Sequence, residues 1–173
     1  MQKGISNIKI RMAYPKDMPT IASVLYKSFV EYEALYTAKG FAATTATKSQ
    51  IKQRMREGPV WVALLNDVIV GTVSAVPKSD LLYIRGMAIL PTARGQGIGK
   101  LLLNEIESFA RRQGYQRLEL STTPFLNRAI RLYERVGFRR SSEGPHDLFG
   151  TALFSMVKIL QPSGSVTVMN HTL

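Results

Sequence analysis

The spacing of hydrophobic residues changes along the chain, and each change predicts a different element. Apolar and charged residues alternate from Ile8 to Met12, which predicts a half-buried strand. After Asp17, a suitable N-cap, apolar residues recur three and four positions apart and predict a helix with one buried side. Residues 31–47 show little periodicity and predict a loop, or a short second helix that continues through Ile51. The buried side of the first helix is expected to contain Met18, Ile21, Val24, Leu25, Ser28 and Phe29.

Three strands are predicted in the middle of the chain. Residues 60–65 and 68–76 are rich in β-branched side chains and are joined by Asn66-Asp67, a dipeptide suited to the positive φ angles of a tight hairpin turn. These two strands should therefore pair antiparallel. A third strand is predicted at residues 81–90 and ends at Pro91, because proline cannot continue a sheet ladder.

Helical spacing returns after a group of glycines. Gly114 is expected to end the first helix of this region. Residues 117–121 predict a short strand, and Thr123-Pro124 offers a cap and a first-turn proline for a second helix that ends at Gly137. The expected buried face of the first helix is Ile98, Leu101, Leu102, Ile106 and Phe109. The expected buried face of the second helix is Leu126, Ala129, Ile130 and Tyr133.

The last part of the chain predicts two more strands, one beginning at Phe138 and one at residues 153–159, connected by residues 141–150. The segment from Gln161 onward is polar, so we expect a mobile tail at residues 161–173. A chain of 173 residues suits one hydrophobic core, which places a single domain at residues 1–160. The order of elements predicts an α/β fold in which helices cover both sides of a mixed sheet.

Composition narrows the classes of function. A formal net charge of +11 suits a nucleic-acid binder, a protein of acidic membrane surfaces or an enzyme for a polyanionic cofactor. Basic residues are spread through apolar segments, so most are expected on solvated faces. No long apolar stretch and no signal-peptide pattern is present, so we expect a cytoplasmic protein that does not cross a membrane. The absence of cysteine excludes disulfides, thiolate metal sites and a cysteine nucleophile.

The clearest chemical signal is a predicted strand, the loop Arg94-Gly95-Gln96-Gly97-Ile98-Gly99, and then a helix. Helix N-termini have N–H groups without partners, which attract phosphate together with the helix dipole. The P-loop pattern fails, because Leu101 stands where it needs Ser or Thr and Arg94 stands at its first glycine. The dinucleotide-binding pattern fails, because Lys100 or Leu102 stands at its third glycine.

The loop resembles the acetyl-CoA pyrophosphate loop of the GNAT acetyltransferase superfamily, Arg/Gln-x-x-Gly-x-Gly/Ala, which Arg94, Gly97 and Gly99 match. Residues 127–138, NRAIRLYERVGF, are similar to a later family segment with Asn, Ala, Leu-Tyr and Gly-Phe. The similarity covers roughly residues 8–159. It implies a mostly antiparallel sheet with splayed parallel central strands and flanking helices.

The resemblance implies that acetyl-CoA is the cofactor. Its pantetheine arm would lie in the gap between the strands at residues 82–90 and 117–121, with hydrogen bonds to the unpaired edge of the first strand. Backbone N–H groups of the loop would bind the pyrophosphate, Arg94 would add charge, and Asn127 would bind the arm. The residues that the resemblance assigns to the cofactor are Met87, Ala88, Ile89, Arg94, Gly95, Gln96, Gly97, Ile98, Gly99, Lys100 and Asn127.

The implied reaction is direct transfer of an acyl group from the thioester to an amine. The amine must first lose a proton, because an alkylammonium with a pKa of ~10 has no lone pair at neutral pH. The developing oxyanion needs a donor, such as a backbone N–H of the strand that ends at Leu90. By similarity, the Tyr133 hydroxyl serves the departing thiolate, although packing on the apolar stripe explains this tyrosine about as well.

The sequence does not assign a general base. Many family members carry a carboxylate on the strand before the loop, and residues 83–87 contain none. Arg85 in this segment favours a negatively charged acceptor group nearby if its side chain faces the cleft. The candidates for the base are a chain of water molecules or Glu31, Glu33, Asp80 and His146.

Alternatives to an N-acyltransferase acting on a small-molecule or peptide amine stay open. One is a catalytically weak module of the same fold that binds or senses acyl-CoA. Another is a nucleic-acid-binding domain, which is not expected because no aromatic-basic stacking motif is present. Acceptor specificity is expected in residues 31–57 and 141–150, the least patterned segments. The resemblance is compatible with a homodimer through the late strands, and the sequence identifies neither the acceptor nor the length of the acyl group.

Overall fold

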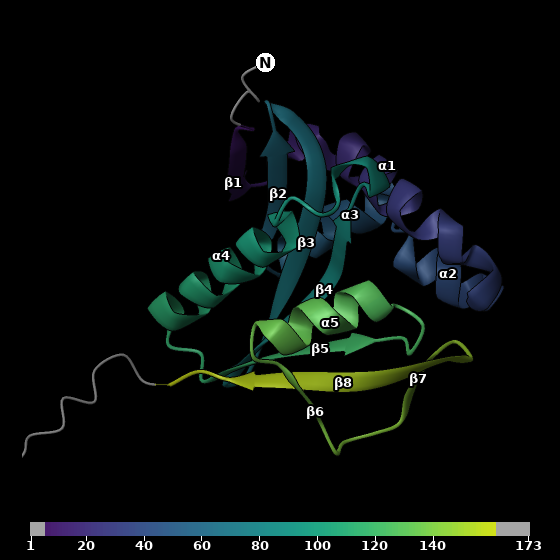
Figure 1. The fold of residues 1–173 in the computed structure, drawn as a ribbon, viewed down its shortest axis with the longest axis vertical. Coiled ribbons are helices and arrows are strands. Elements are labelled where there is room, and N and C mark those ends of the chain that lie inside the picture. Colours follow the sequence, from purple (N-terminus) through teal and green to yellow (C-terminus); the bar gives the residue numbers. More distant parts are fainter. Residues whose placement is uncertain (1–5, 162–173) are drawn as a thin grey trace, which may run out of the picture.

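A computed structural model describes residues 6–161 as an eight-stranded sheet with helices on both faces (Figure 1). The predicted tail lies outside the described residues from residue 162 onward. The strand order is β1-β2-β3-β4-β5-β8-β6, with β7 paired to β8. The strands are β1 (Ile8–Met12), β2 (Val60–Leu65), β3 (Val68–Lys78), β4 (Leu81–Ile89), β5 (Arg117–Thr122), β6 (Arg139–Arg140), β7 (His146–Leu148) and β8 (Thr151–Ile159). The α-helices are α1 (Met18–Phe29), α2 (Ala38–Thr44), α3 (Lys48–Glu57), α4 (Ile98–Gln113) and α5 (Asn127–Arg135), and the 3-10 helices are η1 (Pro15–Asp17), η2 (Val30–Leu35) and η3 (Pro91–Ala93).

The first four strands form an antiparallel meander, in which each strand pairs with the next. The predicted Asn66-Asp67 hairpin joins β2 to β3, with φ angles of 50° and 66°. Positive φ is uncommon outside glycine, and Asn and Asp tolerate it better than other residues. The hairpin prediction from this dipeptide is therefore confirmed.

The sheet opens between β4 and β5, as the resemblance predicted. The two strands are parallel, and their pairing extends only from Leu81 with Arg117 to Ile84 with Leu120. Beyond this point β4 pairs only with β3, while β5 continues to pair with β8. In Figure 1 the two strands run in clearly different directions. The edge of β4 that faces β5 is consequently without a strand partner after Ile84.

A β-bulge bends β4 at the point where it leaves β5. Thr72 and Ser74 of β3 lie two residues apart, but their partners Ala88 and Arg85 lie three apart. Gly86, inside this interval, has a φ of 61°. Glycine adopts positive φ without steric penalty, and bulges re-aim the strand that carries them.

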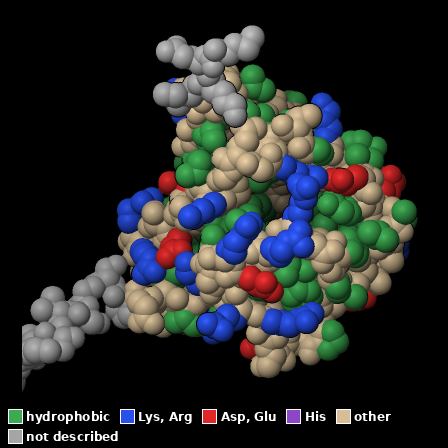
Figure 2. Space-filling model, viewed as in Figure 1, with side chains coloured by type: hydrophobic (Ala, Val, Ile, Leu, Met, Phe, Trp, Pro, Cys, Tyr) green, Lys and Arg blue, Asp and Glu red, His purple; other side chains and the backbone are tan. Residues whose placement is uncertain are grey.

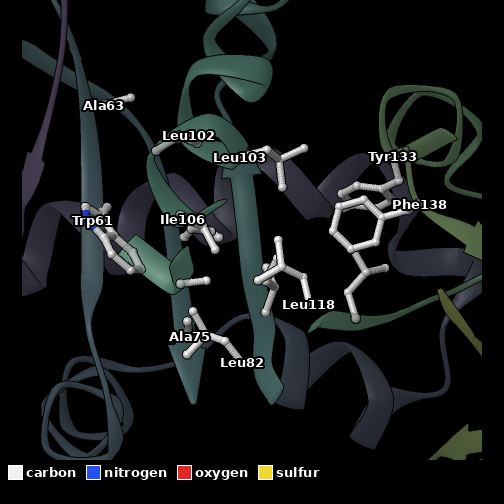
Figure 3. Close-up of a cluster of buried hydrophobic side chains, with 14 of the residues drawn as sticks. Trp61, Ala63, Ala75, Leu82, Leu102, Leu103, Ile106, Leu118, Tyr133 and Phe138 are labelled. Carbon is white, nitrogen blue, oxygen red and sulfur yellow. The ribbon is translucent and has the colours of Figure 1, made fainter. Parts of the chain in front are cut away.

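Two hydrophobic clusters lie on opposite faces of the sheet. Successive strand side chains point to opposite faces, so β2 contributes Val62 to one cluster and Trp61 and Ala63 to the other. Helices α1 and α3 cover the first cluster, and α4 covers the second. Figure 3 shows the second cluster, with Tyr133 and Phe138 together at one end.

One predicted core position of α4 is wrong. Leu101 is 40% exposed, whereas Leu103, which was not predicted to be buried, is 3% exposed. Ile98, Leu102 and Ile106 are buried as predicted. Leu103 follows Gly99 by one helical turn, and an added Cβ at Gly99 would lie 2.6 Å from Leu132 of α5. Helical spacing alone does not reveal burial of this flank.

The cap predicted at Thr123-Pro124 is also wrong. Helix α5 begins at Asn127 after the N-cap residue Leu126, and the Thr123 side chain is buried in the preceding turn. Tyr133 of the predicted stripe is buried, whereas Leu126 and Ala129 are only half-buried. Both line an open cleft, which explains why their apolar surface is incompletely covered.

Three parts of the chain differ from their predictions in detail. Asp17 precedes α1, but its carboxylate accepts hydrogen bonds from the Tyr14 N–H and from Arg11, both at 2.7 Å, and does not cap α1. Residues 31–47 contain η2 and α2, and the predicted connection 141–150 contains β7.

None of the helices within residues 6–161 combines the length and the apolar composition that crossing a membrane requires.

Candidate active site

A cleft of about 1020 Å³ opens where β4 leaves β5. Its walls are β4, the start of α4, one face of α5 and the segment from the end of α1 to α3. Figure 2 shows this face of the molecule hollowed, with Lys and Arg side chains around the hollow. The α5 arginines among the lining residues are exposed, as expected for a solvated face, and they lie at the rim together with Lys100. These arginines are Arg128, Arg131 and Arg135.

The loop before α4 presents free N–H groups to this cleft. Gly97 is the N-cap residue, with φ 79° and ψ 11°, and no side chain caps the helix there. The first hydrogen bond of the helix runs from the Leu101 N–H to the Gly97 carbonyl at 3.1 Å. The N–H groups of Ile98, Gly99 and Lys100 thus have no acceptor within the helix. All three residues line the cleft, where the helix dipole adds partial positive charge.

The loop glycines serve two purposes. Gly95 and Gly97 have φ angles of +80° and +79°, and an added Cβ would meet no atom within 4 Å at either position. Their backbone conformation favours glycine, and the space beside them is open. At Gly99 an added Cβ would lie 2.6 Å from Leu132 of α5 and 3.1 Å from Ile89. Gly99 therefore permits the close packing of α4 on α5.

The free edge of β4 continues the cleft from this loop. Met87, Ala88 and Ile89 line it, and β4 has strand partners at this level only on the β3 side. An unpaired strand edge offers N–H and carbonyl groups to an extended ligand. The residues that the resemblance assigned to the cofactor thus converge here, and all of them except Gln96 and Asn127 line the cleft.

Tyr133 places a buried hydroxyl in the cleft. The residue is 7% exposed, and its ring packs edge-on against Phe138 with the centroids 5.9 Å apart. The hydroxyl lies 3.9 Å from the sulfur of Met87. Burial raises the pKa of Tyr133 well above its ordinary value, and the neighbouring Tyr36 raises it further. The hydroxyl therefore keeps its proton at neutral pH and acts as a hydrogen-bond donor there.

Arg94 lines the cleft, but its guanidinium is already engaged. One terminal nitrogen lies 2.5 Å from a Glu31 carboxylate oxygen, and the other donates to the Ser28 carbonyl at 3.1 Å. These contacts join the loop to the end of α1 and to η2. Arg94 thus fixes the loop in place, and its charge is shared with Glu31.

None of the four side chains considered as a general base lines the cleft. Glu31 pairs with Arg94, and Asp80 lies 3.9 Å from Arg117 at the opposite end of β4. Glu33 and His146 are exposed on η2 and β7. Among the described residues that line the cleft there is no Asp, Glu or His, so of the alternatives considered, water is the one left inside it.

Arg54 of α3 is a cleft residue that the sequence analysis missed. It joins Tyr36 and Thr44 in the wall contributed by residues 31–57, while residues 141–150 contribute Leu148. The available signal was helical spacing, because Arg54 follows the buried Ile51 by three positions and lies on the same face of its helix. Both segments expected to surround the acceptor thus do contribute to the cleft.

The sequence of the chain matches a known protein family. Residues 24–138 match the sequence profile of the Acetyltransferase (GNAT) family. The chain is 33% identical over 129 residues to an Escherichia coli (strain K12) protein, the uncharacterized N-acetyltransferase YjgM, and the alignment covers 71% of this chain and 77% of that one. It is 35% identical over 108 residues to rat N-acetyltransferase 8, where it spans 59% of this chain and 48% of the relative.

Solved structures share the fold. The PaiA N-acetyltransferase of Thermoplasma acidophilum, in complex with coenzyme A, superposes with a TM-score of 0.77 at 18% identity over 89% of this chain and 99% of that one. The yncA structure of Salmonella typhimurium with its cofactor acetyl-CoA has a TM-score of 0.69 at 23% identity, over 89% of this chain and 94% of its own. Given the profile match and the Escherichia coli relative, the chain belongs to the GNAT acetyltransferase family.

Proposed function

We propose that this chain is an N-acetyltransferase that moves an acetyl group from acetyl-CoA directly to an amine. One observation carries the proposal: the open glycine loop of α4, the unpaired edge of β4 and the protonated hydroxyl of Tyr133 meet in a single cleft. The Thermoplasma and Salmonella structures, which have the same fold and contain coenzyme A and acetyl-CoA, support the assignment of the cofactor.

The loop suits the diphosphate of coenzyme A. The unpaired N–H groups of Ile98, Gly99 and Lys100 offer several donors to a compact anion, and helix N-termini bind phosphate in this way. The open space beside Gly95 and Gly97 permits the approach of a phosphate group to the backbone. The basic rim of α5 adds a long-range attraction for a polyanion.

The edge of β4 and Tyr133 suit the remaining part of the cofactor. An extended pantetheine arm would pair with the backbone of residues 87–89, as an added strand would. When bound, acetyl-CoA supplies the acyl group as a thioester, whose C–S bond breaks as the C–N bond of the amide forms. The protonated Tyr133 hydroxyl can donate a hydrogen bond to the sulfur that carries the developing charge.

The proton of the amine would leave to water. The described residues that line the cleft include no carboxylate and no imidazole to accept it. The cleft is instead lined by cationic side chains, and nearby positive charge lowers the pKa of an ammonium group. The cleft therefore favours an acceptor that binds with its amine already neutral.

An amine panel tests this proposal. Purified protein is incubated with acetyl-CoA and aminoacyl, polyamine, aminoglycoside or N-terminal peptide acceptors, and free thiol release is followed together with the mass of the product. We expect at least one acceptor to gain one acetyl group for each thiol released. Coenzyme A binding without transfer to any member of such a panel would instead support the sensing module, and the absence of binding would reject both.

A further inference from the structure

The part of the cleft away from the phosphate loop contains a guanidinium without a carboxylate partner. Arg54 reaches from α3 over Gly86, where an added Cβ would lie 2.5 Å from its terminal nitrogen. Its only protein contact as a hydrogen-bond donor among the described residues is the Ala43 carbonyl, at 3.4 Å. None of the ion pairs found within residues 6–161 includes Arg54.

A second guanidinium lies beside it. Arg85 of β4 lines the same end of the cleft and forms an ion pair with Glu57, a carboxylate that also acts on the charge of Arg54. The Nε atom of Arg85 is buried and finds no hydrogen-bond acceptor in the described part of the chain. Burial lowers the pKa of Arg54 and the charge of Arg85 lowers it further, against the opposing effect of Glu57. Two cations thus share one anion at this end of the cleft.

A half-buried charge that is only partly compensated is costly unless a ligand supplies a further anion. Under the proposed function the phosphates of coenzyme A lie at the loop before α4 and its uncharged pantetheine arm lies along residues 87–89, so no anionic group of the cofactor is placed beside Arg54 and Arg85. The neighbouring wall is aromatic. Tyr36 packs edge-on against Phe125 with centroids 4.9 Å apart, and Tyr32 also lines the cleft.

We infer that the acceptor is an amine that also carries a carboxylate, which pairs with Arg54, and an apolar group that lies against Tyr32 and Tyr36. This inference rests on the proposed function, since it names the class of acceptor for the same cleft. The Arg54 guanidinium orients the acceptor through the carboxylate of the acceptor. The neutral amine of the acceptor is left free to face the thioester. Bidentate pairing of a guanidinium with a carboxylate supplies both attraction and orientation.

Paired substrates and inhibitors test the inference on the full chain. Thiol release is measured with phenylalanine and with phenylethylamine, which differ by the carboxylate, and inhibition is measured with phenylpropionate and with its neutral amide. We expect phenylalanine to have the higher kcat/KM, by about tenfold or more, and phenylpropionate to inhibit where the amide does not. Equal kcat/KM values together with equal inhibition by the acid and the amide would overturn the inference.

Substitutions of Arg54 test whether it forms the proposed carboxylate site. Arg54→Met should raise the KM for phenylalanine about tenfold or more and abolish inhibition by phenylpropionate, with the KM for acetyl-CoA unchanged. Arg54→Lys should recover part of the loss. The control is Arg56→Met, which removes an exposed charge from the same helix outside the cleft and should change neither value. Urea unfolding of each variant excludes a folding defect.

The outcomes separate this inference from the proposed function. Direct calorimetry of phenylpropionate with the parent and with Arg54→Met needs no catalysis. Binding that depends on Arg54 in a protein without transferase activity would reject the enzyme and keep the carboxylate site. Transfer to phenylethylamine with no binding of phenylpropionate would keep the enzyme and reject the site. A preference for succinyl-CoA over acetyl-CoA, without a preference among acceptors, would place the carboxylate on the acyl group and overturn the inference.

Discussion

Tyr133 contributes both to the packing of the core and to the lining of the cleft. Its ring fills the cluster beside Phe138, and its hydroxyl is the atom that faces Met87 in the cleft. Tyr133→Phe keeps the ring and removes only the hydroxyl. We expect kcat to fall by about 10²-fold, the lower end of the range for a proton-transfer group, with coenzyme A affinity and the urea midpoint nearly unchanged.

The pH dependence provides an internal check on this tyrosine. Since burial raises the pKa of Tyr133, the hydroxyl stays protonated throughout the neutral range and contributes no inflection there. The parent and Tyr133→Phe should therefore show pH–rate profiles of the same shape at different heights. A variant with the parent's kcat would instead leave Tyr133 with a packing role alone.

Asp17 is a residue whose contribution is to stability. It is 5% exposed, and its carboxylate accepts hydrogen bonds from Arg11 and from the Tyr14 N–H, which joins η1 to β1. Asp17→Asn should lower the free energy of unfolding by about 1.5–3 kcal/mol at pH 7, as measured in urea. The control Asp67→Asn removes an exposed ion pair with Lys9 at a turn position that Asn tolerates, and should change little.

The pH dependence of this effect has a defined sign. The hydrogen bond from Arg11 lowers the pKa of Asp17 in the folded state, against the effect of burial. Its stabilisation is thus fully present above the unfolded value of about 3.9 and is lost as the pH falls through the lower folded pKa. The difference between parent and Asp17→Asn should shrink below pH ~4 and not at pH 6, and a constant difference would contradict this account.

Among the elements, α4 joins the phosphate loop to the rest of the fold. Its buried face packs on the sheet, and Gly99 brings its first turn against Leu132 of α5. Gly99→Ala should destabilise the protein by about 1 kcal/mol, the lower end of the range for overpacking, because the terminal methyl of Leu132 must shift to make room for the added Cβ. The double variant Gly99→Ala/Leu132→Ala, compared with Leu132→Ala alone in urea, should recover part of the loss. No recovery would show that the contact with α5 is not the cause.

Elements with a single dominant local signal were predicted well. The hairpin at Asn66-Asp67, the α4 stop at Gly114 and the half-buried strand β1 each follow from local backbone chemistry or from side-chain alternation. The predictions of the buried face of α4 and of the start of α5 were partly wrong: the flank of α4 that contains Gly99 is buried, and so is the Thr123 side chain that was expected to cap α5. Local spacing holds no information about this burial.

The residues of the candidate site also fall into those that a local pattern indicates and those that only the tertiary structure brings together. The loop of residues 94–99 and Tyr133 were found because they belong to contiguous motifs of the family. The partnership of Arg94 with Glu31 and the position of Arg54 beside Arg85 depend on how α1, α3 and β4 assemble. These pairs are separated by long stretches of sequence, so no local pattern could have joined them.

On the scale of the whole molecule, the loop before α4 and the Arg54 guanidinium lie at two ends of one cleft. Under the proposed function the loop end would bind phosphate through backbone N–H groups, and under the further inference the Arg54 end would bind the carboxylate of the acceptor. The net charge of +11 and the basic rim attract both anions to the same face of the protein. Both proposals thus give the positive charge a role that does not need nucleic acid.

Two glycines of α4 allow a matched test of the phosphate site. Gly97 and Gly114 flank opposite ends of this helix, with φ angles of +79° and +81°, and neither has an atom within 4 Å of an added Cβ. A glutamate at either position carries the same backbone strain and the same charge. Only at Gly97 would its carboxylate oppose the diphosphate of coenzyme A.

The most direct measurement is isothermal titration calorimetry of coenzyme A with the parent, Gly97→Glu and Gly114→Glu. We predict saturable binding to the parent and to Gly114→Glu, and a loss of affinity of at least about tenfold in Gly97→Glu, since a single repulsive charge pair of ~1.4 kcal/mol suffices for that change. Binding of equal strength by Gly97→Glu and the parent, or no binding to the parent at all, would contradict the account.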